Sequence, residues 1–136
     1  MLAACGPYPR DVSGTLDRIE RSQVIRIGFA ELRSEQEAKA DRFVDRLRAA
    51  TGATARVDTA PAEAQLARLE DGQLDLVIGE FAQDTPWLAS VAVLEPLDQR
   101  SVGGRHLGLA AAAANGENRW IALVEREIRN GGAGPS

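Results

Sequence analysis

The chain has 136 residues, 44% of them hydrophobic and 26% charged, with a formal net charge of −4. This length and composition are typical of one folded globular domain and exclude a disordered tail. Basic and acidic residues are interspersed, which argues against a nucleic-acid-binding surface, and no apolar stretch reaches the roughly 18 residues of a membrane-spanning helix. Aromatic residues make up only 4% of the chain, so we expect a core built mainly from Leu, Val, Ile and Ala.

Helical and strand patterns alternate along the chain. Ser13-Gly14-Thr15 offers a cap for a first helix, Gly52 ends a second, and Pro61 suits the first position of a third. We expect helices at 16–19, at 35–50, between Pro61 and Gly72, and from the turn at 115–118 to residue 130. β-Branched and apolar runs predict strands at 24–29, 53–58, 75–79, 91–97 and 106–114. The alanines of the last run would suit a helix equally well, and Pro96 confines the fourth strand to an edge or exit position.

This alternation predicts an α/β fold whose sheet is mostly parallel and covered on both faces. We divide the chain into an N-terminal tether at 1–12, a single α/β lobe at 13–130 and a flexible tail at 131–136. Residues 98–104, between the fourth and fifth strands, are interpreted as a polar connector.

The single cysteine, Cys5, has no partner for an intramolecular disulfide. Its context, Leu2-Ala3-Ala4-Cys5-Gly6, resembles a bacterial lipobox, the cleavage site of a lipoprotein signal. The resemblance implies that Cys5 is lipidated and that the protein is anchored by lipid on the periplasmic side of a bacterial membrane. This prediction requires a signal segment upstream of Met1, because only four residues precede Cys5. The alternative is a chance match in an alanine-rich start.

The most informative segment is 75–87, in which a short apolar run ends in a polar loop. This pattern predicts a buried strand that delivers a loop to the end of the sheet, where open α/β folds bind ligands. We take Glu80, Phe81, Thr85 and Trp87 as candidate ligand- or partner-binding residues. The structural alternatives are that Thr85 caps a local turn, that Trp87 packs on the edge of its own lobe, and that Glu80 is simply solvated.

Four segments carry a family resemblance in a shared order: 14–19 with 24–28, 64–79, 84–87 with 95–97, and 107–117 with 120–128. They resemble the first lobe of periplasmic solute-binding proteins of the amino-acid type, which serve ABC transporters. The resemblance implies a three-layer lobe of the type II periplasmic-binding-protein-like fold, with about five strands. It also implies the strand order second, first, third, fifth, fourth, with the fifth strand antiparallel to the others.

In that family two lobes close on a ligand, and residues 98–104 stand here where the second lobe would be. Relatives carry an arginine after the Thr-Pro of the ligand loop, which binds the ligand carboxylate, whereas Trp87, Leu88 and Ala89 follow Thr85-Pro86 in this chain. We therefore expect a noncatalytic solute-binding-like module with weakened or lost amino-acid binding. Its implied partners are a small polar solute and a membrane transporter or envelope protein.

An alternative hypothesis is a structural or interaction lipoprotein. Its cleft face, left uncovered without a second lobe, would dock a protein partner or a second copy of the chain as a homo-oligomer. Exposed side chains at Phe81 and Trp87 would favour this hypothesis.

No catalytic, metal or cofactor pattern stands out in the sequence. His106 is the only histidine, and it has no neighbouring cysteine or carboxylate pattern that would predict a metal site. The stretch 103–108 has part of a phosphate-loop spacing, but Leu109 and Ala110 replace the required Lys and Ser/Thr. A Gly-x-Ser-x-Gly elbow is also missing. We therefore expect neither an enzyme nor a cofactor.

Overall fold

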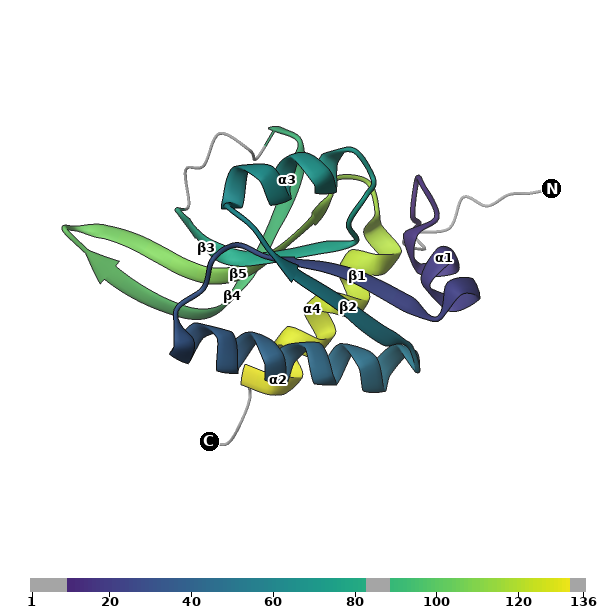
Figure 1. The fold of residues 1–136 in the computed structure, drawn as a ribbon, viewed down its shortest axis with the longest axis horizontal. Coiled ribbons are helices and arrows are strands. Elements are labelled where there is room, and N and C mark those ends of the chain that lie inside the picture. The colour runs from purple at the N-terminus through teal and green to yellow at the C-terminus, as the bar shows by residue number, and fades with distance from the viewer. Residues whose placement is uncertain (1–9, 83–88, 133–136) are drawn as a thin grey trace.

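The computed structural model describes residues 10–82 and 89–132. These residues form one five-stranded sheet with helices on both of its faces (Figure 1). In chain order the elements are α1 (Thr15–Ser22), β1 (Val24–Phe29), α2 (Ser34–Thr51), β2 (Thr54–Thr59), α3 (Ala62–Glu70), β3 (Leu76–Ala82), β4 (Val91–Val102), β5 (Arg105–Ala114) and α4 (Asn118–Gly132).

The strands lie in the order β2-β1-β3-β5-β4. Strand β1 pairs in parallel with both β2 and β3, and β5 pairs antiparallel with both β3 and β4. Four strands therefore share one direction and β5 runs against them. This confirms the α/β fold and the strand order that the family resemblance implies, including the single reversed strand.

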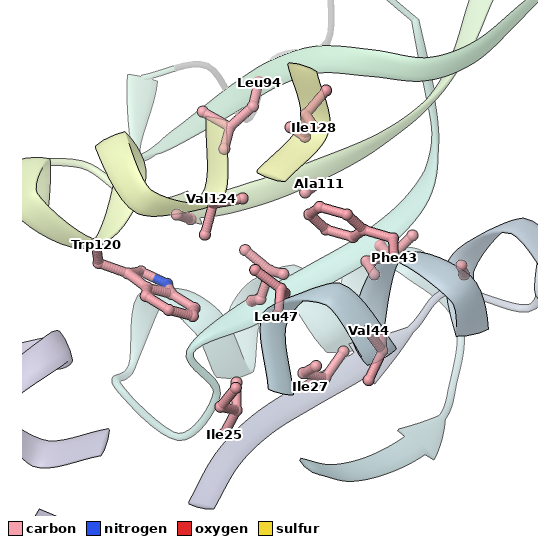
Figure 2. Close-up of a cluster of buried hydrophobic side chains, with 14 of the residues drawn as sticks. Ile25, Ile27, Phe43, Val44, Leu47, Leu94, Ala111, Trp120, Val124 and Ile128 are labelled. Atoms are coloured by element: carbon pink, nitrogen blue, oxygen red, sulfur yellow. The ribbon is translucent and has the colours of Figure 1, made fainter. Parts of the chain in front are cut away.

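One face of the sheet is covered by α1, α2 and α4. Figure 2 shows the centre of this core, where Trp120 of α4 and Phe43 and Leu47 of α2 lie over Ile25 and Ile27 of β1. All five side chains are fully buried. Helix α2 has this buried stripe because its apolar residues recur at helical spacing, and it ends as expected at Gly52, whose φ is 74°.

The opposite face is covered by α3. Its Leu66 and Leu69 pack against Val77 of β3 and against Ala110 and Ala112 of β5. Successive residues of a strand face opposite sides of the sheet, so Ile78, which follows Val77, lies in the core covered by α1, α2 and α4. Strands β3 and β5 are therefore apolar on both faces. The predicted burial of Ile27, Val77 and Ile78 is confirmed, and Phe29 also lies in the core.

The alanine run at 110–114 belongs to a strand and not to a helix. The side chains of Ala110 to Ala113 are each at most 2% exposed, because β5 is hydrogen-bonded on one edge to β3 and on the other to β4. Two paired edges and two covered faces outweigh the intrinsic helical preference of alanine.

Residues 98–104 are not a connector, contrary to the sequence interpretation. Strand β4 continues through this segment, Val102 pairs with Arg105, and only Gly103 and Gly104 form the turn. Their φ angles are 55° and 79°, and two-residue hairpin turns with positive φ at both positions strongly favour glycine. The resulting hairpin extends beyond the rest of the sheet (Figure 1). Pro96 lies at a register shift in β4, which is an edge strand as predicted.

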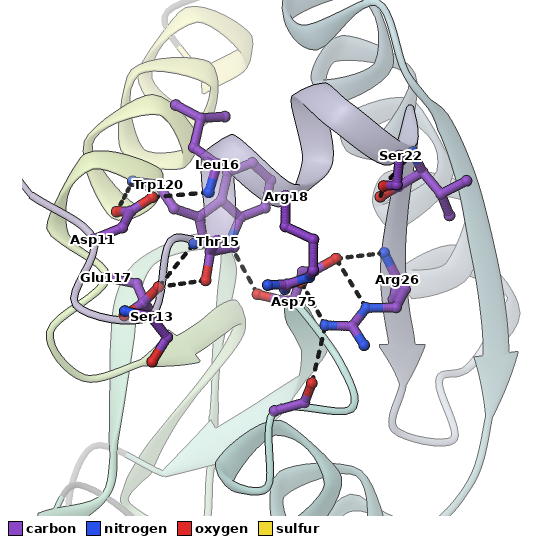
Figure 3. A network of polar contacts seen from close by, with 12 residues as sticks. Asp11, Ser13, Thr15, Leu16, Arg18, Ser22, Arg26, Asp75, Glu117 and Trp120 are labelled. Carbon is purple, nitrogen blue, oxygen red and sulfur yellow. Dashed lines mark hydrogen bonds and ion pairs between the residues drawn. The ribbon is translucent and has the colours of Figure 1, made fainter.

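A polar network joins the amino ends of the strands to α1 and α4 (Figure 3). At its centre is Asp75, whose side chain has no exposed surface. It accepts hydrogen bonds from the backbone N–H of Arg26 at 2.8 Å and from the guanidinium groups of Arg26 and Arg18. The Asp75 carbonyl oxygen accepts the indole N–H of Trp120 at 2.9 Å.

Two further carboxylates in this network cap the helices from a distance. Glu117, which precedes α4, accepts the N–H groups of Ser13 and Thr15 at the start of α1. Asp11, which precedes α1, accepts the N–H of Leu16 in α1 and the N–H of Trp120 in α4, both at 2.8 Å. The expected local cap from Ser13-Gly14-Thr15 is therefore replaced, since the N-cap Gly14 offers no side chain.

We predict that Asp75→Asn lowers the free energy of unfolding by about 2–4 kcal/mol, because it leaves two arginines without their buried counter-charge. Chemical denaturation monitored by circular dichroism measures this change. Asp17→Asn is the matched control, because Asp17 pairs with Arg119 at a site where both side chains are about half exposed, and it should cost no more than about 0.5 kcal/mol. Equal losses for the two variants would contradict the structural role given to Asp75.

Candidate functional site

The candidate site lies at the carboxyl ends of β1 and β3. Strand β1 pairs with β3 only as far as Phe29 and Ile78, whereas β3 continues along β5 to Ala82. The backbone N–H of Ala30 donates to the Ile78 carbonyl at 2.9 Å. A Cβ atom at Gly79 would lie 2.8 Å from the Cβ of Ala30, so glycine is needed for this close approach. The result is a ledge, residues 79–82, that projects past the end of β1.

The turn after β1 borders this ledge. Glu31 adopts a left-handed conformation with φ of 49°, which costs a non-glycine residue on the order of 1 kcal/mol. Leu32 packs against the core, and the N–H of Arg33 donates to the Gln36 side chain at 3.0 Å, which fixes the start of α2. The turn is thus held at both ends. The strain at Glu31 has no signal in the sequence, because glutamate is not a residue that favours positive φ.

The structure places two of the four predicted site residues. Glu80 is partly exposed on the ledge. Phe81, which the docking hypothesis needs to be exposed, is instead 7% exposed and packs with Val77 and Ala110 in the α3 core. The reason is the strand's two-residue period, since Phe81 shares the face of Val77. Thr85 and Trp87 lie outside the described residues, as does Cys5, and their roles stay predictions.

Two hollows in the described part of the chain lie away from the ledge. The larger, about 210 Å³, is lined by α2, β4 and α4 and carries three cations, Lys39, Arg42 and Arg46. Two of these cations are engaged, since Lys39 pairs with Asp98 and Arg46 donates to the Glu127 carbonyl at 3.1 Å. The smaller hollow, about 110 Å³, adjoins β2 and α3. Sequence reasoning found neither, because each joins residues far apart in the chain.

The residues that the structure describes contain no group of three or more His, Cys, Asp or Glu side chains arranged to hold a metal ion. Among the same residues, no helix combines the length and the apolar character needed to span a membrane. The groups present at the ledge are the backbone groups at the strand end and the Glu80 carboxylate.

Neither the comparison with protein-family models nor the search of curated proteins found a match. Solved structures do match. The arginine-bound form of domain 1 of TmArgBP, from T. maritima, has a TM-score of 0.70 at 13% identity, with 84% of this chain and 98% of that chain covered. The ancestral cationic amino acid solute-binding protein AncCDT-1 has a TM-score of 0.70 at 10% identity, covering 85% and 93%.

A third match is the VFT2 domain of Bordetella pertussis BvgS, with a TM-score of 0.64 at 9% identity and coverage of 89% and 93%. Identities this low establish the fold and leave the ligand open. The resemblance inferred from the four sequence segments is thus confirmed at the level of structure. This chain has the fold of one lobe of an amino-acid-type periplasmic solute-binding protein.

Proposed function

We propose that the protein is a noncatalytic, one-lobed binding module that takes a small polar solute, such as an amino acid, weakly at the ledge. The observation that carries the proposal is the match, over most of the chain, to an isolated solute-binding domain described as arginine-bound. That match supports solute binding by a single lobe. The ledge lies at the carboxyl ends of parallel strands, which is the usual ligand position in open α/β sheets.

Two features argue for weak binding. The hairpin closes with the two-residue turn Gly103-Gly104, and in the family that the sequence resembles a second lobe would supply the opposite wall of the site. A ligand on one open surface stays hydrated and loses most of the burial that pockets provide. In addition, Trp87, Leu88 and Ala89 follow Thr85-Pro86, where the resembled family places the arginine that binds the ligand carboxylate.

We predict that L-arginine and other free amino acids bind with dissociation constants no better than about 1 mM, which corresponds to roughly −4 kcal/mol. Isothermal titration calorimetry of the monomer measures this. Glu80→Gln should weaken the binding of a ligand that carries an amine, because it removes the carboxylate on the ledge. Glu70→Gln is the matched control, since Glu70 is an exposed glutamate at the end of α3. Micromolar affinity would refute weak binding, and equal affinities for the two variants would place the ligand elsewhere.

We further propose that the module is held on the periplasmic side of a bacterial membrane by a lipid on Cys5, where it meets a transporter or another envelope protein. The lipobox-like sequence supports this, and the fold supports it indirectly because its matches include the substrate-binding protein of an amino acid ABC transporter.

Expressed with its natural upstream sequence in a bacterium, the protein should fractionate with membranes. Cys5→Ser should move it to the aqueous fraction or block its maturation, because the thiol is the point of lipid attachment. Immunoblots of the fractions and the intact mass of the mature chain measure these changes. The same aqueous fractionation for both forms would contradict the anchor and would leave the solute-binding proposal unaffected.

A further inference from the structure

Strand β2 is an unpaired edge of the sheet. It pairs with β1 over six residues without a register shift. Five of these residues are exposed and the other, Ala55, is half-buried. On one face Ala55 packs against the core, and on the other Asp58 contacts Gln65 and Arg68 of α3, so the faces of the strand are partly covered and its outer edge is open. Natural proteins usually protect such an edge with charged side chains, proline, a bulge or a covering element. Residues 54–59 contain no proline and no bulge, and their charged residues are Arg56 and Asp58.

Hydrogen bonds to β1 determine which groups of β2 face outward. The N–H of Thr54 donates to the Gln23 carbonyl at 3.0 Å, and the N–H of Ala60 donates to the Phe29 carbonyl at 3.1 Å. In a parallel ladder alternate residues bond to the same neighbour, so the even-numbered residues of β2 face β1. The N–H and C=O groups of Ala55, Val57 and Thr59 therefore point away from the sheet.

The side chains of β2 place one exposed apolar residue between two charged residues. Val57 is 41% exposed and is one of the two exposed large hydrophobic residues in the described part of the chain. Arg56 is exposed and has no ion pair within residues 10–82 and 89–132. Asp58 follows on the same face. The Gln65 amide and the Arg68 guanidinium hold the pKa of Asp58 below its ordinary value, so its carboxylate is charged at neutral pH.

We propose that two copies of this chain pair through β2, antiparallel and about a two-fold axis at Val57, to form one continuous sheet. In this register Val57 faces Val57 of the second copy as a hydrogen-bonded pair, and Ala55 faces Thr59 on either side. All the outward-pointing backbone groups of these three residues are then satisfied. Arg56 of each copy lies opposite Asp58 of the other in the closely spaced, non-hydrogen-bonded position, where side-chain contact is strongest.

Charge selects this register over its neighbours. Sliding the two strands so that the axis passes through Arg56 places the two arginines opposite each other. Moving the axis to Asp58 places the two aspartates opposite each other. Both shifts keep the backbone bonding pattern but set like charges directly across the pair, which is destabilising. Only the axis at Val57 gives two opposite-charge pairs and an apolar contact, and a two-fold contact closes on itself at the dimer.

The test is the concentration dependence of mass by sedimentation equilibrium, with Cys5→Ser in every sample so that no intermolecular disulfide contributes. We expect a monomer–dimer equilibrium with a dissociation constant on the order of 100 µM, as befits a small interface. Val57→Pro should abolish the dimer and keep the fold, because the lost N–H is one that faces outward. Arg56→Asp should weaken the dimer at least about tenfold, since it sets two pairs of like charges across the interface.

A mixing experiment sharpens the result. Arg56→Asp and Asp58→Arg should each be monomeric alone, and their equimolar mixture should form a heterodimer with both charge pairs restored. Far-UV circular dichroism checks that each variant is folded. If Asp58→Arg is unfolded, the effects of Val57→Pro and Arg56→Asp on dimer formation still test the proposal. A wild-type monomer up to about 1 mM overturns the proposal. So does a dimer unaffected by Val57→Pro and Arg56→Asp, or an open-ended polymer, which would indicate pairing of β2 with β4.

Discussion

The architecture of the lobe depends on one buried carboxylate, Asp75. A carboxylate with no exposed side-chain surface costs several kcal/mol unless its partners are correctly placed. Here the partners come from α1 through Arg18 and from β1 through Arg26, while the Asp75 backbone carbonyl binds Trp120 of α4. The charge is therefore tolerated only when α1 and β1 meet at the start of β3, and the carbonyl of the same residue joins α4 to that point. We regard this network as the feature that fixes how the helices are placed around the sheet.

The network lies at the opposite end of the sheet from the candidate site. Asp75, Glu117 and Asp11 all act at the amino ends of the strands or at the starts of helices packed there. The ledge at 79–82 lies at the other end of β3, beyond the last residue that pairs with β1. The network already fixes the helices at the amino ends of the strands. The loops at the carboxyl ends can therefore differ among proteins of this fold without disturbing the core.

Much of the fold could be predicted from sequence, for reasons that particular residues illustrate. The apolar spacing in 35–50 and the glycine at 52 are local signals, and so are the runs around Ile27 and Ile78. The order of the strands is not local and came from the family resemblance. The polar network could not be predicted, because Glu117 caps residues about a hundred positions away and nothing in either segment alone points to the other.

Two sequence interpretations that the structure corrects also have physical causes. Residues 98–101 are polar, which suggested a loop, but their backbone pairs with β5, and Gly103-Gly104 was the available sign of a tight turn. Phe81 was grouped with the loop that follows it, although its even spacing from Val77 places it on the α3 face of the strand. Glu80, one residue earlier, takes the opposite side and stays accessible.

The tight turn at Gly103-Gly104 has a consequence for how the chain folds. In a two-lobed relative of the kind the sequence resembles, the partners of the β4–β5 pair would be separated by a whole lobe, and each doubling of an intervening loop costs about 0.6 kcal/mol of closure entropy. Here the two strands are adjacent in sequence, and their pairing is a local event that requires no other domain to be in place. The β4–β5 hairpin can therefore form early and add to β3 as a preassembled unit, which lowers the contact order of a sheet whose remaining pairings are all long-range.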